Sequence, residues 1–471
     1  MESLIGRTKE KKQLLDSLKS KKPEFVAIYG RRRVGKTYLI RQSFGQTFTF
    51  YLTGMANSSL KNQLLNFSQT LKNISKREFD LPLTWFEAFE QLKAHIELSK
   101  EEKKIIFIDE LPWLDTPKSN FISVLEHFWN HWASDRKDIL LVVCGSAASW
   151  MINKLINNRG GLHNRLTKRI KLNPFNLKET EDFLRYKGII LERYQIVQLY
   201  MAFGGIPYYL DEIVKGESAA QNIERICFSE SGALRNEFNV LFKSIFNNYS
   251  KHEQIVKALA TKNAGLLRTE MIDQLKLKDG GSISKTLSEL EESGFIRKYK
   301  SFNKKVNQNV YQLTDFYSLF YLKYILNSKI DPDNWINFMS DAHWTGYAYE
   351  LVWLQHINQI KQNLGIIGVL SNTATWHGAT DLGKAQIDLL LDRKDYIINI
   401  CEAKFSISEF VISKEYATNL RKKIAIFTEA TKTKKTVFLT ILTTFGLKEN
   451  ENSLGLIQNT LTLENLFNAD L

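Results

Sequence analysis

The sequence predicts an α/β protein in which a parallel sheet is followed by a helical region, a small module of helices with a β-hairpin, and a second α/β domain. Three observations lead to this fold class. Short apolar segments alternate with helical ones over residues 24–175, as in a doubly wound parallel sheet. Short amphipathic helices follow over residues 252–295. Two apolar strands with charged residues among them occupy residues 386–405.

Length and composition limit the number of domains and the kinds of partner and environment that the chain can have. The chain has 471 residues, which at roughly 100–200 residues per domain suggests two to four domains. Its net charge of +13 favours a polyanionic partner, most simply a nucleic acid such as DNA, although a generally lysine-rich surface would give the same value. The three cysteines show no CxxC spacing, and no long apolar run occurs. We therefore expect a cytoplasmic, soluble protein without a disulfide framework, a zinc site or a membrane span.

A glycine-rich loop joins the first predicted strand to a helix. Residues 24–30 are mostly β-branched or aromatic, which predicts a buried strand. The segment GRRRVGKT follows at residues 30–37, and a predicted helix comes next. This context predicts a P-loop, whose backbone amides wrap phosphate. We expect Lys36 to reach the β- and γ-phosphates of ATP and the Thr37 hydroxyl to bind Mg²⁺. The predicted nucleotide-binding residues of the loop are Gly30, Arg31, Arg32, Arg33, Val34, Gly35, Lys36, Thr37 and Tyr38.

The later strands of the first region supply the polar groups that such a site needs. Residues 47–54 form a strand, and residues 103–109 form another that ends at Asp109, where a carboxylate would hold Mg²⁺. Glu110 follows it and can orient and deprotonate the attacking water. The strand over residues 138–146 ends at Ser146, which would face the γ-phosphate. Residues 167–175 are the fifth predicted strand.

An arginine, a pair of histidines and a helical segment accompany this predicted core. Arg165 lies in an arginine-rich stretch, where it is either a finger for a neighbouring subunit's γ-phosphate, which would require a homo-oligomer, or part of a solvated basic loop. His127 and His131 are one helical turn apart, and without a third ligand we interpret them as structural or surface residues. Residues 179–213 look like a helical lid that is interrupted at residues 204–207.

The motifs LIGRTKEKKQLL, GRRRVGKT, FIDELPWL, CGSAASWM and GGIPYYL resemble the archaeal-type ATPases of the AAA+/STAND class. The resemblance covers about the first half of the chain. It implies a P-loop ATPase sheet with the strand order 5-1-4-3-2. It also implies that the segment Ile5, Gly6 and Arg7 lies near the adenine. We see no clear sensor-2 arginine in the sequence.

The middle of the chain reads as a winged helix-turn-helix. Three short helices lead to a hairpin over residues 295–315 with a basic tip, and Ile283, Leu287, Leu290 and Phe295 are spaced to share one face. Its third helix could enter a major groove, with Lys285 on the exposed side and Lys304 and Lys305 on phosphates. The alternative is that this region only packs against its neighbours.

The last region carries a second set of chemically active residues. A long helix over residues 341–360 bears Glu350, and two strands carry Asp388, Glu402 and Lys404. Because residues i and i+2 of a strand face the same way, Glu402 and Lys404 project together, and Asp388 can join them if the strands pair. Two carboxylates bind Mg²⁺ or Mn²⁺ through oxygen, and Lys404 can position a nucleophile or offset charge.

The motifs GYAYE, QIDLLLDR and CEAKF resemble the PD-(D/E)XK nuclease fold, in the form attached to archaeal-type ATPases. This resemblance covers roughly the last 130 residues. It gives Asp388, Glu402 and Lys404 the catalytic positions and Glu350 a supporting one, although no proline precedes Asp388.

The expected domains are therefore a P-loop ATPase core (residues 1–175), a helical lid (176–245), a winged helix-turn-helix (246–315) and a restriction-endonuclease-like domain (316–471). The expected function is ATP hydrolysis coupled to metal-dependent cleavage of DNA. The alternative is an ATP-dependent signalling or regulatory switch whose nuclease fold is inactive and only binds DNA or a partner protein.

Overall fold

The computed structural model of the chain describes residues 4–45, 47–157, 160–162, 164–246, 248–300, 302, 309–326 and 342–468. The chain divides into two compact units, Met1–Pro174 and Phe175–Leu471. Each unit is described by itself. The expected basic residues Lys304 and Lys305 lie outside the described residues. Among the described residues, no helix combines the length and apolar character that a membrane crossing requires.

The first unit is built around a five-stranded sheet in which every neighbouring pair of strands is parallel. The strands lie in the order β2-β3-β4-β1-β5. Read from the β5 edge, this is the 5-1-4-3-2 order that the resemblance implies. The three central strands are almost wholly buried, as expected for a parallel sheet covered on both faces. The strands are β1 (Glu24–Tyr29), β2 (Phe50–Thr53), β3 (Lys104–Asp109), β4 (Ile139–Gly145) and β5 (Lys168–Lys171).

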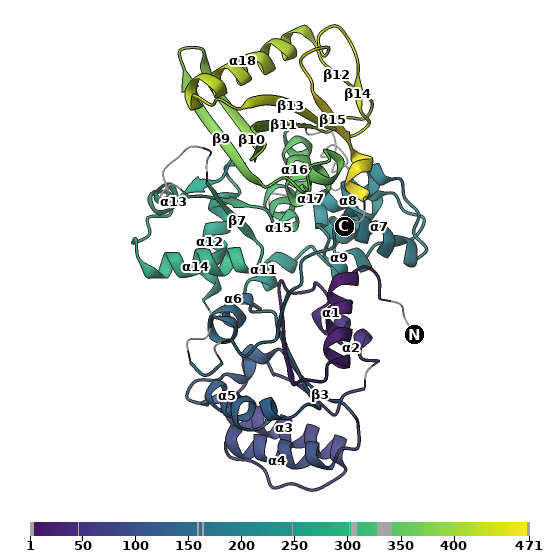
Figure 1. Cartoon of the computed structure of the whole chain (residues 1–471), viewed down its shortest axis with the longest axis vertical. Helices are drawn as coiled ribbons and strands as arrows, with labels where there is room; N and C mark the ends of the chain where they lie inside the picture. The colour runs from purple at the N-terminus through teal and green to yellow at the C-terminus, as the bar shows by residue number, and fades with distance from the viewer. Residues whose placement is uncertain are drawn as a thin grey trace. The chain divides into compact units, whose positions relative to one another are not determined.

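The helices of the first unit form two groups (Figure 1). Helices α1 and α2 contact each other, whereas α3, α4 and α5 share one aromatic-rich core with the sheet. Phe67, Trp85 and Phe121 are among its largest fully buried side chains. The α-helices are α1 (Thr8–Lys19), α2 (Lys36–Ser43), α3 (Leu60–Ser75), α4 (Trp85–Leu98), α5 (Phe121–His131) and α6 (Ala148–Trp150), with shorter turns η1 (Leu111–Leu114), η2 (Ala133–Asp135) and η3 (Met151–Ile156).

The second unit begins with short helices in the region of the expected lid. Asn176 starts the first of them with a capping box, because its side chain accepts from the Glu179 amide while the Glu179 carboxylate accepts from the Asn176 amide. Gly205 explains the break in the sequence pattern: a Cβ there would lie 1.8 Å from the Phe175 carbonyl oxygen. The helices are α7 (Leu177–Tyr186), α8 (Arg193–Phe203), α9 (Pro207–Asp211), α10 (Ala219–Ile223), η4 (Glu224–Phe228) and α11 (Glu237–Leu241).

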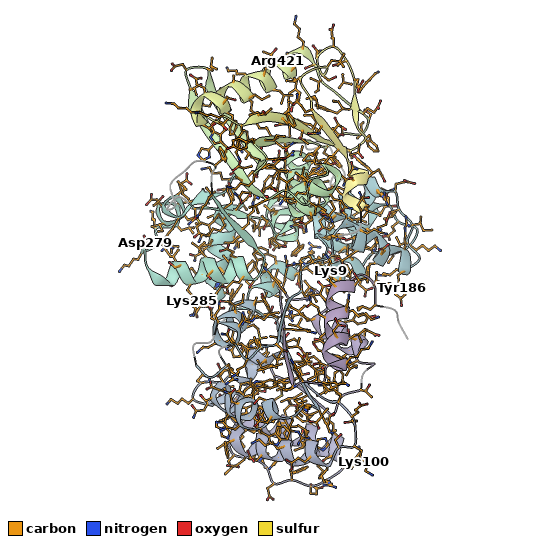
Figure 2. All side chains as sticks on the ribbon, viewed as in Figure 1. Lys9, Lys100, Tyr186, Asp279, Lys285 and Arg421 are labelled. Carbon is orange, nitrogen blue, oxygen red and sulfur yellow. The ribbon has the colours of Figure 1, made fainter. Side chains whose placement is uncertain are left out.

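Residues 249–313, called the middle module from here on, combine three helices with a three-stranded antiparallel sheet of order β6-β8-β7. Ile283, Leu287 and Leu290 are buried on the third helix, so the amphipathic pattern correctly predicted its inner face. Phe295 is also buried, but it lies beyond the end of this helix at Glu292. Lys285 points to solvent on the same helix (Figure 2). The elements are α12 (Tyr249–Leu259), β6 (Leu266–Leu267), α13 (Arg268–Leu275), α14 (Gly281–Glu292), β7 (Ile296–Lys300) and β8 (Asn309–Leu313).

The last part of the second unit contains a mixed five-stranded sheet of order β15-β13-β11-β10-β9. Strands β9, β10 and β11 are antiparallel, and β11, β13 and β15 are parallel. Helix α18 contacts β9 and β10, whereas α16 contacts β11 (Figure 1). The elements are α15 (Phe316–Phe320), η5 (Tyr321–Ile325), α16 (Ala342–Gln355), α17 (Ile357–Asn363), β9 (Ser371–Thr380), β10 (Gly383–Arg393), β11 (Ile397–Lys404), β12 (Phe410–Val411), α18 (Lys414–Thr431), β13 (Thr436–Thr443), β14 (Leu447–Lys448), β15 (Asn459–Thr462) and η7 (Leu463–Phe467).

Two expectations for this part need correction. The long helix predicted over residues 341–360 is interrupted at His356, which separates α16 from α17. The His356 Nδ1 bonds to the Val352 carbonyl, and its Nε2 accepts from the Leu177 amide at the start of α7. The histidine therefore serves as a distant cap. The sequence analysis also did not include strand β9, whose asparagine and glycine residues are depleted in strands, although its threonines favour them.

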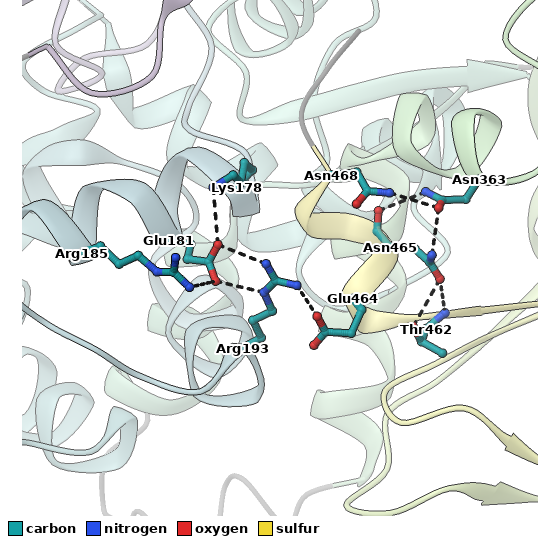
Figure 3. A network of polar contacts seen from close by, with 9 residues as sticks. All are labelled: Lys178, Glu181, Arg185, Arg193, Asn363, Thr462, Glu464, Asn465 and Asn468. Atoms are coloured by element: carbon teal, nitrogen blue, oxygen red, sulfur yellow. Dashed lines mark hydrogen bonds and ion pairs between the residues drawn. The ribbon is translucent and has the colours of Figure 1, made fainter.

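A polar network joins helices α7 and α8 to residues 462–468 (Figure 3). Glu181 on α7 is almost fully buried and pairs with Lys178, Arg185 and Arg193. Arg193 also pairs with Glu464 in η7. Beside it, the side chains of Asn363, Asn465 and Asn468 form hydrogen bonds. These contacts run between residues that are far apart in the sequence, which agrees with residues 175–471 forming one compact unit.

Candidate functional sites

The glycine-rich loop of the first unit connects β1 to α2. Gly30 has a φ of 145°, and a Cβ there would lie 2.2 Å from the Leu172 carbonyl oxygen, so only glycine fits. Gly35, with a φ of 87°, begins α2. The Lys36 ammonium folds back over the loop and donates to the carbonyls of Gly30 and Arg31 at 3.1 and 2.9 Å. The loop thus holds a buried cation next to the amino end of a helix.

The carboxyl ends of β3 and β4 bring polar groups to the same edge of the sheet. The Thr37 hydroxyl donates to Asp109 Oδ2 at 2.8 Å. The Cys144 thiol donates to Asp109 Oδ1. Glu110 directly follows Asp109, and its Oε2 accepts from the Ser146 hydroxyl at 2.9 Å and from the Ser146 amide at 3.2 Å. Residues that are separated by 35 to 72 positions in sequence therefore form one cluster.

The charges of this cluster suit a phosphate with its cation. Burial lowers the pKa of Lys36, while the negative charges of Glu110 and Asp109 favour its charged form. Burial, the charge of Asp109 and the hydrogen bond to it raise the pKa of the Cys144 thiol. The Thr37 hydroxyl and the Asp109 carboxylate are adjacent oxygen donors of the kind that Mg²⁺ prefers, and the residues present therefore fit this ion.

The other residues predicted for this site lie at different distances from it. Arg7 is buried and donates to the Val34 carbonyl at 3.4 Å, which brings the segment Ile5, Gly6 and Arg7 to the phosphate loop. Tyr38 is partly exposed, at 41%, and Arg165 is exposed on the turn that precedes β5.

His127 and His131 lie with their ring centroids 4.5 Å apart, and Phe86 contacts the first ring. No group of three or more potential metal ligands occurs in the described part of the chain. The cysteines Cys144, Cys227 and Cys401 are free and buried.

A strand–loop–helix phosphate site on a five-stranded parallel sheet, with a carboxylate at the end of a neighbouring strand, is the arrangement of P-loop nucleotide-binding domains. Residues 4–213 match the family described as an ATPase domain predominantly from Archaea, which agrees with the resemblance seen in the first half of the sequence. An uncharacterized protein of Methanocaldococcus jannaschii is 28% identical over 325 residues, 68% of each chain.

Among solved structures, a Walker-type ATPase of Pyrococcus abyssi aligns with a TM-score of 0.51 and 18% identity over 68% of this chain and 96% of its own. This likeness concerns the fold. The ORC2 protein of Aeropyrum pernix aligns less well, with a TM-score of 0.41 and 14% identity over 70% of this chain and 95% of its own.

A second polar cluster lies in the mixed sheet of the second unit. Asp388 is on β10, Glu402 and Lys404 are on β11, and Glu350 is on α16. The register of β10 against β9 shifts between Ile387 and Leu390, so Asp388 sits in a β-bulge. Bulges re-aim side chains and are common beside active sites. The structure thus brings together the four residues that the sequence analysis singled out here.

The carboxylates of this cluster differ in their surroundings. Glu402 accepts from Lys423 at 2.6 Å and from the Tyr416 hydroxyl at 3.1 Å, and Lys404 lies 3.4 Å away. Although burial opposes it, the charges of Lys423 and Lys404 lower the pKa of Glu402. Burial raises the pKa of Asp388, and the Glu402 charge adds to this effect.

Glu350 is the carboxylate whose ionisation is most strongly opposed. Burial, followed by the negative charges of Asp388 and Glu402, raises its pKa to about 8. The site thus holds more negative charge than its surroundings stabilise. A divalent cation would relieve this excess, and carboxylate oxygens are suitable donors for Mg²⁺ or Mn²⁺. The donor set consists of two carboxylates, Asp388 and Glu402, and Lys423 neutralises the second of these in the structure.

Sequence analysis missed Lys423, Tyr416 and Gln386. The first two lie on one face of α18, seven residues or two turns apart, and both reach Glu402. The Gln386 amide donates to Asp388 Oδ1 at 2.6 Å. The helical spacing of Tyr416 and Lys423 was visible in the sequence. Their contact with Glu402 was not visible, because Glu402 lies on β11, which is a separate element of the chain.

Proposed function

We propose that the chain couples an ATP-dependent switch in its first unit to metal-dependent phosphodiester cleavage of DNA in its last domain. The observation that carries the second half of this proposal is the cluster of Asp388, Glu402 and Lys404 on adjacent antiparallel strands, with Glu350 beside it. The order of three antiparallel strands, a helix and a parallel strand supports a restriction-endonuclease-like fold. The helices and hairpin of residues 246–315 support a winged helix-turn-helix, and residues 176–245 a lid.

In the ATPase half, Lys36 would contact the β- and γ-phosphates, and Thr37 and Asp109 would hold Mg²⁺. Glu110 would orient the attacking water and accept its proton. Its hydrogen bonds from Ser146 support a role for Ser146 in linking the γ-phosphate to this base. Arg165 is exposed, as a finger for a second copy of the chain requires. Homo-oligomerisation belongs to this proposal.

In the nuclease half, Asp388 and Glu402 would hold Mg²⁺ or Mn²⁺, which supplies charge stabilisation at the scissile phosphate and lowers the pKa of a bound water. Lys404 would position the nucleophile or offset developing negative charge. The alternative function is a regulatory switch in which this fold binds DNA or a partner protein without cutting. The pairing of Glu402 with Lys423 favours that alternative, since it satisfies a ligand carboxylate without a metal.

The test measures two activities in one preparation. The full chain is incubated with linear, circular and single-stranded DNA and Mg²⁺ or Mn²⁺, with and without ATP, while phosphate release is followed. Asp388→Ala should abolish cleavage and leave ATP hydrolysis intact, whereas Glu110→Gln should bind ATP but hydrolyse it at least ~100-fold more slowly. Asp381→Ala is the matched control, because Asp381 is an exposed aspartate in the same hairpin.

If the wild-type chain cuts none of these DNA forms, the regulatory alternative is correct for the last domain. Normal ATP turnover in Glu110→Gln would contradict the role of Glu110. Cleavage by Asp388→Ala at the wild-type rate would assign the activity to a different site.

A further inference from the structure

The carboxylate cluster is covered by the middle module. A cavity of about 220 Å³ lies between the β6-β8-β7 sheet and the last domain, and an adjoining cavity of about 440 Å³ shares part of its lining. Glu350 and Asp388 line both cavities. Residues of the middle module that line the first cavity include Arg297, Tyr299 and Gln312. One wall of the site therefore comes from residues about 90 positions before Asp388.

Arg297 is held firmly in this wall. Its Nε donates to Gln312 Oε1 at 2.5 Å across the β7–β8 pair, and its guanidinium lies 4.6 Å from the Tyr299 ring centroid. The Gln312 amide donates in turn to the Asn263 carbonyl at 2.6 Å and to the Tyr347 hydroxyl at 3.3 Å. Tyr347 lies one turn before Glu350 on α16. Hydrogen bonds thus connect the arginine to the helix that carries a site carboxylate.

The contacts of Arg297 leave its outer nitrogens available. Within the described residues, its one hydrogen bond is made by Nε, and no carboxylate is paired with it. Burial works against its charge, and the nearby negative charge of Asp388 supports it. Two parallel N–H groups on a fixed guanidinium match the oxygens of a phosphate. The cavity thus presents a cation for the ligand's phosphate opposite the carboxylates that would hold the metal.

The shape of the cavity restricts the form of nucleic acid that can enter. Pockets of roughly 300–1,000 Å³ hold a single small molecule, and the larger cavity, of about 440 Å³, lies within this range, whereas the adjoining one is smaller, at about 220 Å³. A backbone hydrogen bond joins the segment after β7 to β9 at this cavity, because the Phe302 amide donates to the Thr375 carbonyl at 2.8 Å. Tyr299 and His377 contribute aromatic rings to the lining. Unpaired bases stack on such rings, whereas paired bases are already stacked within a duplex.

We propose that Arg297 is a substrate-binding residue of the carboxylate site and that this composite pocket takes the phosphate of a single nucleic-acid strand in preference to a duplex. Cleavage of the bound strand rests on the proposed nuclease function, whereas binding of the strand through Arg297 does not depend on it. The middle module then contributes directly to the site, in addition to any contact that its α14 helix makes with DNA.

Binding is measured by fluorescence anisotropy on the full chain in Mg²⁺, with a labelled oligodeoxythymidine strand and the duplex that it forms with oligodeoxyadenosine. Arg297→Gln should weaken single-strand binding by ~10-fold or more, the loss expected for hydrogen bonds to a charged group. Arg297→Lys retains the positive charge but lacks the two parallel N–H groups of the guanidinium. Its affinity for the single strand should lie between those of the wild type and Arg297→Gln. Lys298→Gln is the matched control, since Lys298 is exposed on the opposite face of the same strand, and its binding should stay within about 2-fold of wild type.

Cleavage assays on the same oligonucleotides separate this proposal from the proposed function. If wild type cuts neither form but binds the single strand through Arg297, the nuclease function is wrong and the inference stands. If wild type cuts and Arg297→Gln binds and cuts the single strand equally well, the inference is wrong and the function stands. Undetectable single-strand binding, or a duplex bound as tightly as the single strand, would also overturn the inference.

Discussion

Glu350 provides the sharpest test of the electrostatics in the second unit. Its pKa is raised from 4.5 to about 8, first by burial and then by the charges of Asp388 and Glu402. In the unfolded chain the carboxyl group ionises near its usual value, so the folded state retains a proton that the unfolded state loses. The resulting stabilisation of the folded state is complete below the unfolded pKa and is lost as the pH rises toward about 8.

The size of the effect follows from the shift. One pKa unit corresponds to ~1.4 kcal/mol, so a shift from 4.5 to about 8 sets an upper limit of ~5 kcal/mol on the difference. Replacing Glu350 by glutamine retains the neutral shape and removes the group that ionises. Near pH 5 the variant and the wild type should unfold alike. Near pH 8.5 the variant should be more stable by ~2–5 kcal/mol, or roughly 5–15 °C in Tm.

The assay is thermal unfolding of the full chain, followed by circular dichroism in the presence of a chelator across this pH range. Glu402→Gln is the matched control with the opposite sign. The pKa of Glu402 is lowered, because Lys423 and Lys404 outweigh its burial. Its stabilisation is therefore present above the unfolded pKa and lost as the pH falls through the lowered folded value. This variant should be less stable than wild type at neutral and alkaline pH.

An equal effect of Glu350→Gln at both ends of the pH range would mean that Glu350 does not titrate as the structure implies. A loss of stability near pH 8.5 would show that the ionised form of Glu350 is stabilised in the fold, and the argument from burial would then be wrong.

Two further predictions concern packing in the second unit. Gly205→Ala should destabilise this unit by at least ~1–3 kcal/mol in denaturant unfolding, because its new Cβ would meet the Phe175 carbonyl oxygen, whereas Gly346→Ala in α16, with open space around it, should be neutral or stabilising. Equal effects of the two alanines would contradict the close approach of the backbone at Gly205. Glu181→Gln should cost ~1–3 kcal/mol, because it removes a buried acceptor from Arg185 and Arg193, while the same change at the exposed Glu464 should cost less than about 1 kcal/mol. Denaturant unfolding measures this prediction too. A larger loss of stability for Glu464→Gln than for Glu181→Gln would show that the network of Figure 3 depends on the exposed Glu464.

The sequence by itself determined the features that depend on neighbouring residues. The phosphate loop could be recognised because a strand, a glycine-rich turn and a helix follow one another without interruption from Glu24 to Ser43. The inner face of α14 was predictable from the spacing of Ile283, Leu287 and Leu290. Local sterics and a fixed period govern both patterns, so a short window of sequence contains all the information that they need.

The tertiary structure decided which distant groups meet. Whether Glu110 bonds to Ser146, Glu402 to Lys423, or Arg297 lines the same cavity as Asp388 depends on the order and register of strands and on the packing of helices far away in the chain. The bulge at Asp388 shows the same limit, because one shifted residue in the β9–β10 pairing sets the direction of the side chain. These pairings are chosen by the burial of apolar surface across the whole unit, a sum that no local stretch of sequence contains.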